Sequence, residues 1–192
     1  MEKNRSAGIR NLPNFITALR ILGSASLLFI EPFSSVFFIV YTLSGFSDVL
    51  DGFIARRFNL TSPLGARLDS IADLLFYAVM VLRIFPRLWE ELPVWIWYIV
   101  AVIILLRIAS YVTAAVKYHC FASLHTYMNK VTGAAVFCIP FFMLAPWPVS
   151  VALCLAACAI AAFSTVEELM MHLISKEYHE GVKSIFALRK NV

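Results

Sequence analysis

Four aspartates stand close together in a sequence that is otherwise strongly apolar: Asp48, Asp51, Asp69 and Asp73. Burying a carboxylate is costly unless it pairs with a cation or binds a metal ion. Oxygen ligands without histidine or cysteine favour Mg²⁺, Mn²⁺ or Ca²⁺ over zinc. Four carboxylates are enough for two ions, and two ions suit chemistry at a phosphate group. We therefore predict a site for two Mg²⁺ or Mn²⁺ ions.

The spacing of these residues indicates how the chain brings them together. Asp48 and Asp51 are three residues apart and Asp69 and Asp73 are four apart, so each pair shares one helix face. The connection between the two helices contains Asn59, Ser62 and Pro63, which favour a reversal. Two antiparallel helices then place both aspartate pairs at the same end.

Small residues beside the aspartates leave space for a ligand. Gly52 and Gly65 each cost a helix about 1 kcal/mol relative to alanine, but a glycine lets a ligand or a backbone approach closely. Ala55 keeps the same face slim, and Arg56 lies one turn after Gly52, where its planar guanidinium can reach a phosphate. The glycines therefore leave a hollow that a ligand or a backbone can enter, and Arg56 is placed to reach a phosphate there.

Two other interpretations of the acidic cluster stay open at this point. Acidic residues inside a membrane protein also form proton relays or ion pathways in transporters. Alternatively, the aspartates form a structural network of ion pairs with Arg56, Arg57 and Arg67. Neither interpretation explains the glycines or the intervals.

The composition is that of a polytopic membrane protein. Of 192 residues, 61% are hydrophobic and only 15% are charged. The net charge of +4 is modest, and no basic patch interleaved with aromatic residues suggests nucleic-acid binding. We predict an all-α protein with membrane lipid as its surroundings and no nucleic-acid partner.

The hydrophobic segments predict six transmembrane helices, with a short amphipathic stretch from Ile9 lying at the interface before the first. Proline residues mark the expected breaks at Pro32, Pro63, Pro86, Pro93, Pro146 and Pro148, and Pro140 is a possible kink. The six predicted spans are Thr17 to Ile30, Ser35 to Arg56, Leu64 to Phe85, Leu92 to Tyr118, Tyr127 to Leu144, and Val149 to Ile174.

The distribution of basic residues predicts the orientation. Lysine and arginine gather before the first span, in the connections that follow the second and fourth spans, and in the tail from about residue 175 to 192. Basic residues favour the cytoplasmic side, so both termini and the aspartates are predicted to be cytoplasmic. The compact size and the lack of a cleavable signal favour a bacterial plasma membrane.

Two arginines remain inside predicted spans, Arg20 and Arg107. An ionisable residue within the membrane is a candidate functional residue, and a structural ion pair is the alternative. Glu167 and Glu168 in the last span are the expected partners of Arg20 or Arg107.

The run from Asp48 to Asp73 resembles the signature of the CDP-alcohol phosphotransferase family at every position of that signature. The pattern is Asp48-x2-Asp51-Gly52-x2-Ala55-Arg56-x8-Gly65-x3-Asp69-x3-Asp73. The six-span arrangement also resembles that family, so the likeness covers nearly the whole chain, which we treat as a single domain over residues 1–192.

The resemblance implies transfer of a phosphatidyl group from CDP-diacylglycerol to an alcohol, with release of CMP, by a homodimer. It implies that Asp48, Asp51 and Asp69 hold the metal ions, and that Asp73 shares an ion or acts on the alcohol. Asp73, at the edge of the cluster, is therefore our candidate general base. The resemblance places Gly52, Ala55, Arg56 and Gly65 around the cytidine diphosphate. The competing hypothesis is a small ion transporter that uses the acidic cluster.

The acceptor alcohol is expected to bind beside the metal ions, among polar groups on the cytoplasmic side. Arg107, His125 and Lys130 are candidate acceptor-binding residues, because a cationic side chain binds a phosphorylated alcohol. The segment from Asn11 to Ile21 resembles the start of phosphatidylglycerophosphate synthases. Those enzymes carry a Gly-Lys-x-Lys-Thr segment where this chain has Asn129-Lys130-Val131-Thr132-Gly133. Glycerol 3-phosphate is our first choice, with inositol phosphate, inositol or serine as alternatives.

Overall fold

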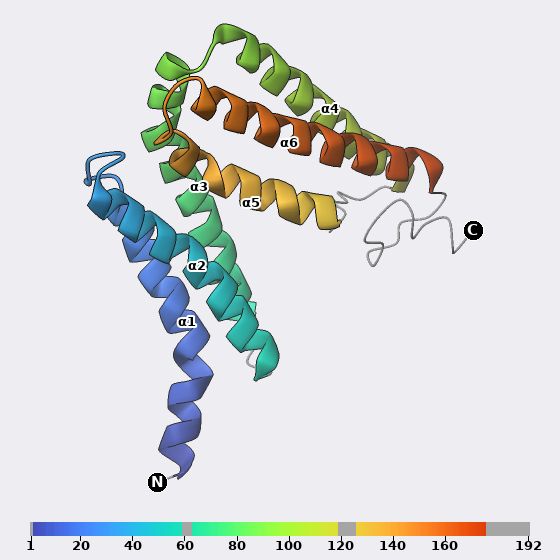
Figure 1. Cartoon of the computed structure of the whole chain (residues 1–192). Coiled ribbons are helices and arrows are strands. Elements are labelled where there is room, and N and C mark those ends of the chain that lie inside the picture. The colour runs from blue at the N-terminus through green and yellow to red at the C-terminus, as the bar shows by residue number, and fades with distance from the viewer. Residues whose placement is uncertain (1, 59–62, 119–125, 176–192) are drawn as a thin grey trace. The chain divides into compact units, whose positions relative to one another are not determined.

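The computed structural model describes residues 2–58, 63–118 and 126–175, and the side chains of residues 14–54, 57–58, 65, 67–118 and 126–175. All regular structure in these ranges is helical, as predicted (Figure 1). The six helices are α1 (Glu2–Ser26), α2 (Ser35–Arg57), α3 (Pro63–Glu91), α4 (Val94–Tyr118), α5 (Tyr127–Phe142) and α6 (Val149–Ile174).

Helices α2, α3 and α6 cover their predicted segments, α4 begins two residues late, α5 ends two residues early, and α1 differs from the expectation. The predicted interfacial stretch from Ile9 and the first part of the predicted span from Thr17 form one continuous helix that ends at Ser26. Pro86 does not break α3, contrary to the prediction, and the helix continues to Glu91. A proline removes only its own N–H, so the residues after Pro86 can still form helical hydrogen bonds.

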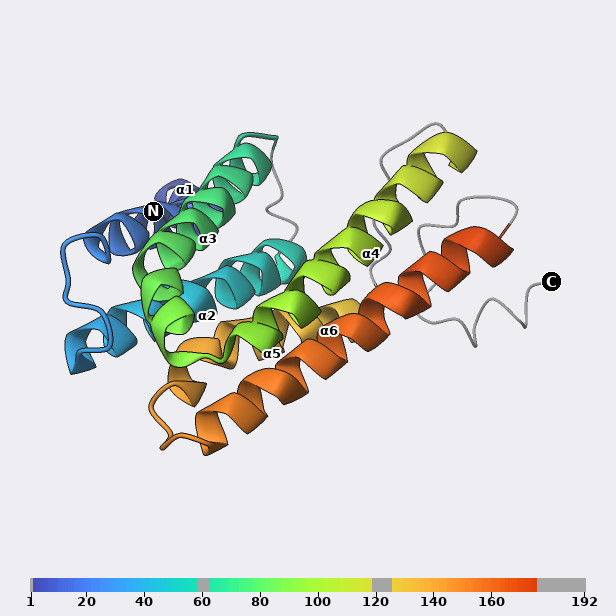
Figure 2. The same cartoon turned by 90° about the horizontal axis from the view of Figure 1, so that it is seen from above.

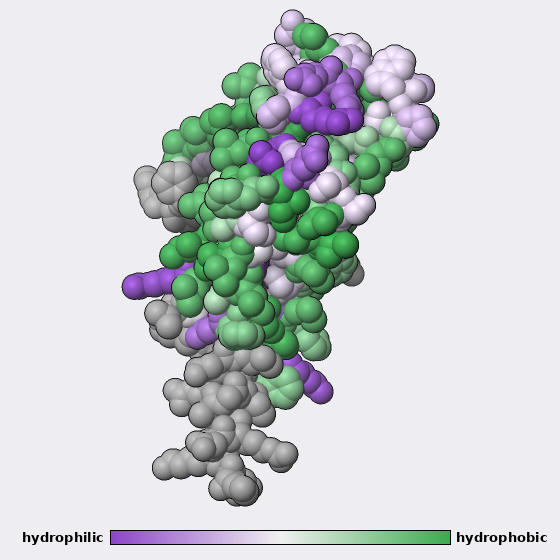
Figure 3. Space-filling view, turned by 90° about the vertical axis from the view of Figure 1, so that its left-hand side faces the viewer, coloured by the Kyte–Doolittle hydropathy of each residue, from purple (hydrophilic) through white to green (hydrophobic). Residues whose placement is uncertain are grey.

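In the part of the chain that the structure describes, three helical segments are long and apolar enough to cross a membrane: Ser35–Ile54, Val94–Tyr118 and Val149–Ile174. The other three predicted spans and the interfacial stretch stay predictions. Large apolar side chains lie exposed along α2, α4 and α6, among them Leu43, Leu105 and Leu173. Figure 3 shows a face on which hydrophobic residues predominate. Such a surface fits a lipid environment.

The chain divides into two compact units, residues 1–90 and 91–192. In the first unit, α1 packs against α2, and α3 contacts both helices. The Tyr41 ring stacks on Phe76 of α3, with ring centroids 5.3 Å apart. Farther along α3, the Arg83 guanidinium donates to the Ile30 carbonyl oxygen at 2.6 Å. Aromatic packing and a capped carbonyl thus hold α3 against its neighbours.

A glycine sets the separation of α1 and α2. A Cβ atom added at Gly23 would lie 2.6 Å from the hydroxyl oxygen of Ser44, but 3.9 Å from the Ser44 Cβ atom. Small residues allow helices to approach closely in membrane proteins. The Ser44 side chain is buried, so its hydroxyl has little space to move away.

We expect Gly23→Ala to lower the stability of the wild-type chain and to raise it in a Ser44→Ala background. Overpacking costs about 1–3 kcal/mol, whereas alanine gains about 1 kcal/mol of helix propensity. Removal of the Ser44 hydroxyl eliminates the overpacking and leaves the gain. The unfolding midpoints of the four proteins in detergent test this prediction, and equal effects of Gly23→Ala in both backgrounds would contradict it.

In the second unit, α6 packs against both α4 and α5. Figures 1 and 2 show α4 and α6 side by side along their length. At the C-terminal end of the pair, Lys117 donates to the carbonyl oxygens of His172 and Leu173 at 2.9 and 2.8 Å. The Tyr118 hydroxyl donates to the carbonyl oxygens of His172 and Ser175 at 3.2 and 3.0 Å. These side chains satisfy carbonyls that the end of α6 would leave unpaired.

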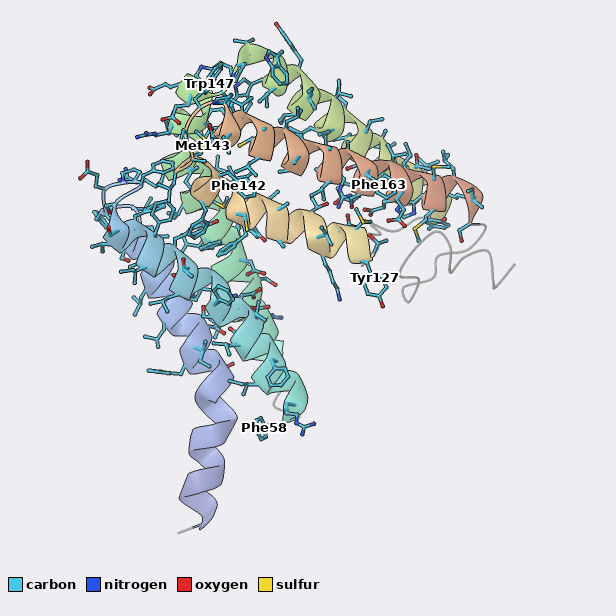
Figure 4. The ribbon with its side chains drawn as sticks, in the orientation of Figure 1. Phe58, Tyr127, Phe142, Met143, Trp147 and Phe163 are labelled. Carbon is cyan, nitrogen blue, oxygen red and sulfur yellow. The ribbon has the colours of Figure 1, made fainter. Side chains whose placement is uncertain are left out.

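Aromatic residues stand at both ends of α5, as Figure 4 shows for Tyr127 and for Trp147 in the connection to α6. The two side chains are 57% and 67% exposed. Exposed tyrosine and tryptophan side chains are enriched where a membrane meets water. Their positions fit the prediction that α5 spans a membrane.

Candidate functional site

The four aspartates lie on two neighbouring helices. Asp48 and Asp51 are in the C-terminal half of α2, and Asp69 and Asp73 are in the first turns of α3. One carboxylate oxygen from each of Asp48, Asp51 and Asp69 lies within 4.8 Å of the other two. The structure therefore brings together residues from both pairs, as the spacing predicted. Asp73 is linked to them through Arg20, which lies near all four carboxylates.

The burial of the four side chains is unequal. The Asp51 side chain is 6% exposed, whereas those of Asp48, Asp69 and Asp73 are 48%, 46% and 45% exposed. The cluster thus has one buried carboxylate and three that are accessible from outside the unit. This arrangement can hold a cation and still admit a second molecule.

A cation from α1 lies among the aspartates. The Arg20 side chain is 1% exposed, and its guanidinium donates hydrogen bonds to Asp48 and Asp69. The same guanidinium lies 3.3 Å from Asp73 Oδ1 and 4.0 Å from Asp51 Oδ2. Among the described residues, Arg20 is the cation that forms ion pairs with these carboxylates.

The sequence did not assign Arg20 to this cluster. Glu167 and Glu168 were the predicted partners of Arg20 or Arg107. Of these pairings, that of Arg107 with Glu168 is confirmed. The alternative network with Arg57 and Arg67 is not seen where side chains are described, and both residues are exposed there. The position of Arg20 inside an apolar run indicated that this arginine needs a partner. Which residues are the partners depends on how α1 packs against α2 and α3.

Thr17 is a second polar residue of α1 that contacts the cluster. Its hydroxyl donates to Asp51 Oδ2 at 2.8 Å, and the residue is 3% exposed. Thr17 was not among the site residues predicted from the sequence. The available signal was its spacing, because Thr17 and Arg20 are three residues apart and share one helix face.

The donor set fits a hard divalent cation. Four carboxylates carry a charge of −4 when ionised, and the Arg20 guanidinium offsets only one of these charges. The ligands available in the group of three are carboxylate oxygens, without histidine or cysteine. Such ligands suit Mg²⁺, Mn²⁺ or Ca²⁺. The negative charge that remains on the cluster favours the binding of a cation.

The residues predicted to line the cytidine diphosphate lie on the same two helices. Gly52 follows Asp51 in α2 and Gly65 precedes Asp69 in α3, and both are partly buried. Ala55 and Arg56 belong to α2, but their side chains are outside the described residues. Figure 4 shows Phe58 at the end of α2, beyond these positions.

The second unit contains its own buried polar group. Glu168 is fully buried, and its Oε2 atom lies 2.7 Å from Arg107 Nη1 and accepts from the Asn129 amide at 2.8 Å. Arg107 also donates to Asn129 Oδ1 at 3.0 Å and to the Tyr111 hydroxyl at 3.1 Å. The Ser164 hydroxyl donates to Asn129 Oδ1 at 2.6 Å. Helices α4, α5 and α6 are thus joined by one hydrogen-bonded network.

The predicted acceptor-binding residues are only partly described. Arg107 is 28% exposed and lies in the network above, whereas Lys130 is exposed on α5. His125 lies outside the described residues. Arg107 and Lys130 therefore stay predictions as acceptor ligands.

The chain matches one family model over most of its length. Residues 10–165 match the family described as CDP-alcohol phosphatidyltransferase. No solved structure matches the chain.

Curated relatives match a shorter part of the chain. A CDP-diacylglycerol–glycerol-3-phosphate 3-phosphatidyltransferase of Pseudomonas fluorescens is 37% identical over 91 residues, which cover 43% of this chain and 47% of the relative. The protein of the same name from Wigglesworthia glossinidia brevipalpis is 32% identical, with 43% and 50% covered. A cardiolipin synthase (CMP-forming) of Streptomyces coelicolor is 45% identical over 58 residues, covering 30% and 26%. The chain thus spans about half the length of the first two relatives, or less.

Proposed function

Because the chain belongs to the CDP-alcohol phosphatidyltransferase family, we propose that it transfers a phosphatidyl group from CDP-diacylglycerol to an alcohol and releases CMP. The observation that carries the proposal is the meeting of Asp48, Asp51 and Asp69 from two helices, with oxygens within 4.8 Å of one another. Glycerol 3-phosphate is the proposed acceptor, since two of the relatives above are named for it.

The proposed reaction exchanges one phosphate ester for another. The acceptor hydroxyl oxygen attacks the phosphorus that carries the diacylglycerol, and a new P–O bond forms. The bond from that phosphorus to the oxygen shared with CMP breaks, and its electron pair leaves with CMP. Asp73 is the proposed base that accepts the hydroxyl proton, and its 45% exposed side chain is accessible to an alcohol.

The aspartates also hold the proposed metal ions. Asp48, Asp51 and Asp69 would bind two Mg²⁺ or Mn²⁺ ions, with Asp73 sharing one. When bound, such ions would offset negative charge on the diphosphate oxygens. Gly52, Ala55, Arg56 and Gly65 are proposed to surround the cytidine diphosphate, with the backbone approaching closely at the two glycines.

The proposed lipid substrate is consistent with an enzyme that lies in a membrane. The tails of CDP-diacylglycerol stay in the bilayer while its diphosphate reaches the polar edge, so an enzyme for it is expected to have membrane-spanning helices. Three candidate spans support an integral membrane protein. We also propose that both termini and the site are cytoplasmic, that the membrane is a bacterial plasma membrane, and that the protein is a homodimer. Basic residues such as Arg57, Arg67 and Lys117 near helix ends support the orientation.

We expect the purified full chain in detergent to release CMP from CDP-diacylglycerol when Mg²⁺ or Mn²⁺ and the correct alcohol are present. Glycerol 3-phosphate, inositol phosphate, inositol, serine and phosphatidylglycerol are supplied in turn. Phosphatidylglycerol tests the cardiolipin-forming reaction for which one relative is named. Removal of the metal with EDTA should abolish CMP release, and added Mn²⁺ should restore it.

Asp73→Asn serves as the control for this assay, because it should retain CDP-lipid binding but lose the transfer. Release with only one other alcohol would replace glycerol 3-phosphate as the acceptor without affecting the reaction class. If no acceptor gives CMP and no CDP-lipid binds, the transferase proposal fails. The acidic cluster should then be tested as an ion-transport site.

A further inference from the structure

Helix α1 carries two buried polar residues that face the aspartate cluster although they lie outside the Asp48–Asp73 run. Thr17 and Arg20 are 3% and 2% exposed. They are three residues apart, so they stand on one face of the helix. Burying a charged guanidinium is costly unless it is paired, so the position of Arg20 requires an explanation.

Arg20 contacts three of the aspartates through one carboxylate oxygen each, and it also donates to the Asp69 backbone carbonyl at 3.4 Å. Its Nη1 atom donates to Asp48 Oδ1 and lies 3.3 Å from Asp73 Oδ1. Its Nη2 atom donates to Asp69 Oδ1. The two ends of the planar guanidinium therefore bridge α2 and α3.

Thr17 completes the pattern at the fourth aspartate. Its hydroxyl donates to Asp51 Oδ2. The Arg20 guanidinium approaches the same Asp51 oxygen at 4.0 Å. Every aspartate of the cluster is thus held through a single carboxylate oxygen by a residue of α1.

A carboxylate has two oxygens, and each can accept more than one partner. Contacts to one oxygen leave the other available to a cation. Residues that hydrogen-bond to metal ligands set the orientation of those ligands. Loss of such a residue typically weakens metal binding about 10–100-fold. Arg20 and Thr17 have the geometry of such groups.

We propose that Thr17 and Arg20 are positioning residues for the metal site, so that α1 orients all four aspartates toward divalent cations. This inference rests on the metal-dependent reaction proposed above. The guanidinium matters for its shape as well as its charge, because its two nitrogen atoms hold Asp48 and Asp69 at once. Lysine keeps the charge but cannot bridge two carboxylates in the same way.

The test measures Mn²⁺ binding to the full chain in detergent, without substrate, by the electron paramagnetic resonance signal of free Mn²⁺. Arg20→Lys should weaken binding about 10–100-fold, and Thr17→Val should weaken it about tenfold. Thr17→Ser keeps the hydroxyl and therefore retains the contact to Asp51. It should bind Mn²⁺ within about twofold of wild type. Size-exclusion chromatography confirms that the folded fraction is measured.

The possible outcomes separate this inference from the function proposed above. Wild-type affinity in both Arg20→Lys and Thr17→Val would overturn the positioning role. Tighter binding in Arg20→Lys would also overturn it, because Arg20 would then be a competitor for the cation position. If Arg20→Lys does not fold, the comparison of Thr17→Val with Thr17→Ser decides the question. A wild-type chain that binds no Mn²⁺ would overturn both the metal-dependent reaction and this inference.

Discussion

Asparagine in place of Asp51 should lower the rate of CMP formation by about a thousandfold or more, equivalent to roughly 4 kcal/mol of transition-state stabilisation. Asp51 is the most buried of the four aspartates and one of the three whose oxygens lie within 4.8 Å of each other. Asparagine has the same shape, but it lacks the negative charge and replaces one acceptor oxygen with a donor. The proposed cation site would therefore lose both charge and a ligand.

The measurement is CMP release at saturating CDP-diacylglycerol and glycerol 3-phosphate, with Mn²⁺ varied over several decades. Glu90→Gln is the matched control, because Glu90 is an exposed acidic residue in the same unit, far along α3 from Asp69. We expect the control to retain wild-type activity. A fully folded Asp51→Asn protein with more than a tenth of the wild-type rate would argue against a metal-binding role for Asp51.

Arg107→Met should destabilise the chain by about 3–5 kcal/mol, and Glu168→Gln should destabilise it less. The asymmetry follows from burial, because Glu168 is fully buried whereas Arg107 is 28% exposed. Removing the arginine takes the guanidinium away from a buried carboxylate that keeps the Asn129 amide at 2.8 Å and the His172 ring at 3.8 Å, so most of the charge on Glu168 is no longer offset. Removing the glutamate charge leaves an arginine that is 28% exposed and keeps its hydrogen bonds to Asn129 and Tyr111.

The double variant Arg107→Met with Glu168→Gln is the internal control for this pair. It contains neither charge, so it should recover most of the stability that Arg107→Met loses. Unfolding in mixed micelles of increasing SDS content provides the comparison of all four proteins. Additive effects of the two substitutions, or a larger loss for Glu168→Gln than for Arg107→Met, would contradict the proposed energetic role of the ion pair.

The sequence predicted the helices well because hydrophobic runs of this length report directly on them. The predicted span from Val149 to Ile174 has the same bounds as α6, and the predicted start of α5 at Tyr127 is also observed. The break predicted at Pro86 was wrong, because a proline disfavours a helix only locally and the following residues can continue it.

The candidate site was predictable where its residues are close in sequence. The spacing of Asp48, Asp51 and Asp69 encodes a shared face and a helical hairpin, and the structure brings these three together. The contribution of α1 was not predictable in this way. Arg20 is separated from Asp69 by 49 positions, and residue periodicity identifies a buried face without identifying what covers it.

The two units differ in when their polar contacts can form during synthesis, which proceeds from the N-terminus. The contacts of Arg20 with the aspartates and of Arg83 with Ile30 all lie within residues 1–90, so these contacts can form before the rest of the chain is made. In the second unit, Arg107 and Lys117 are synthesised long before the α6 atoms that they bind. The order of synthesis therefore makes α6 the helix that completes the polar network of the second unit.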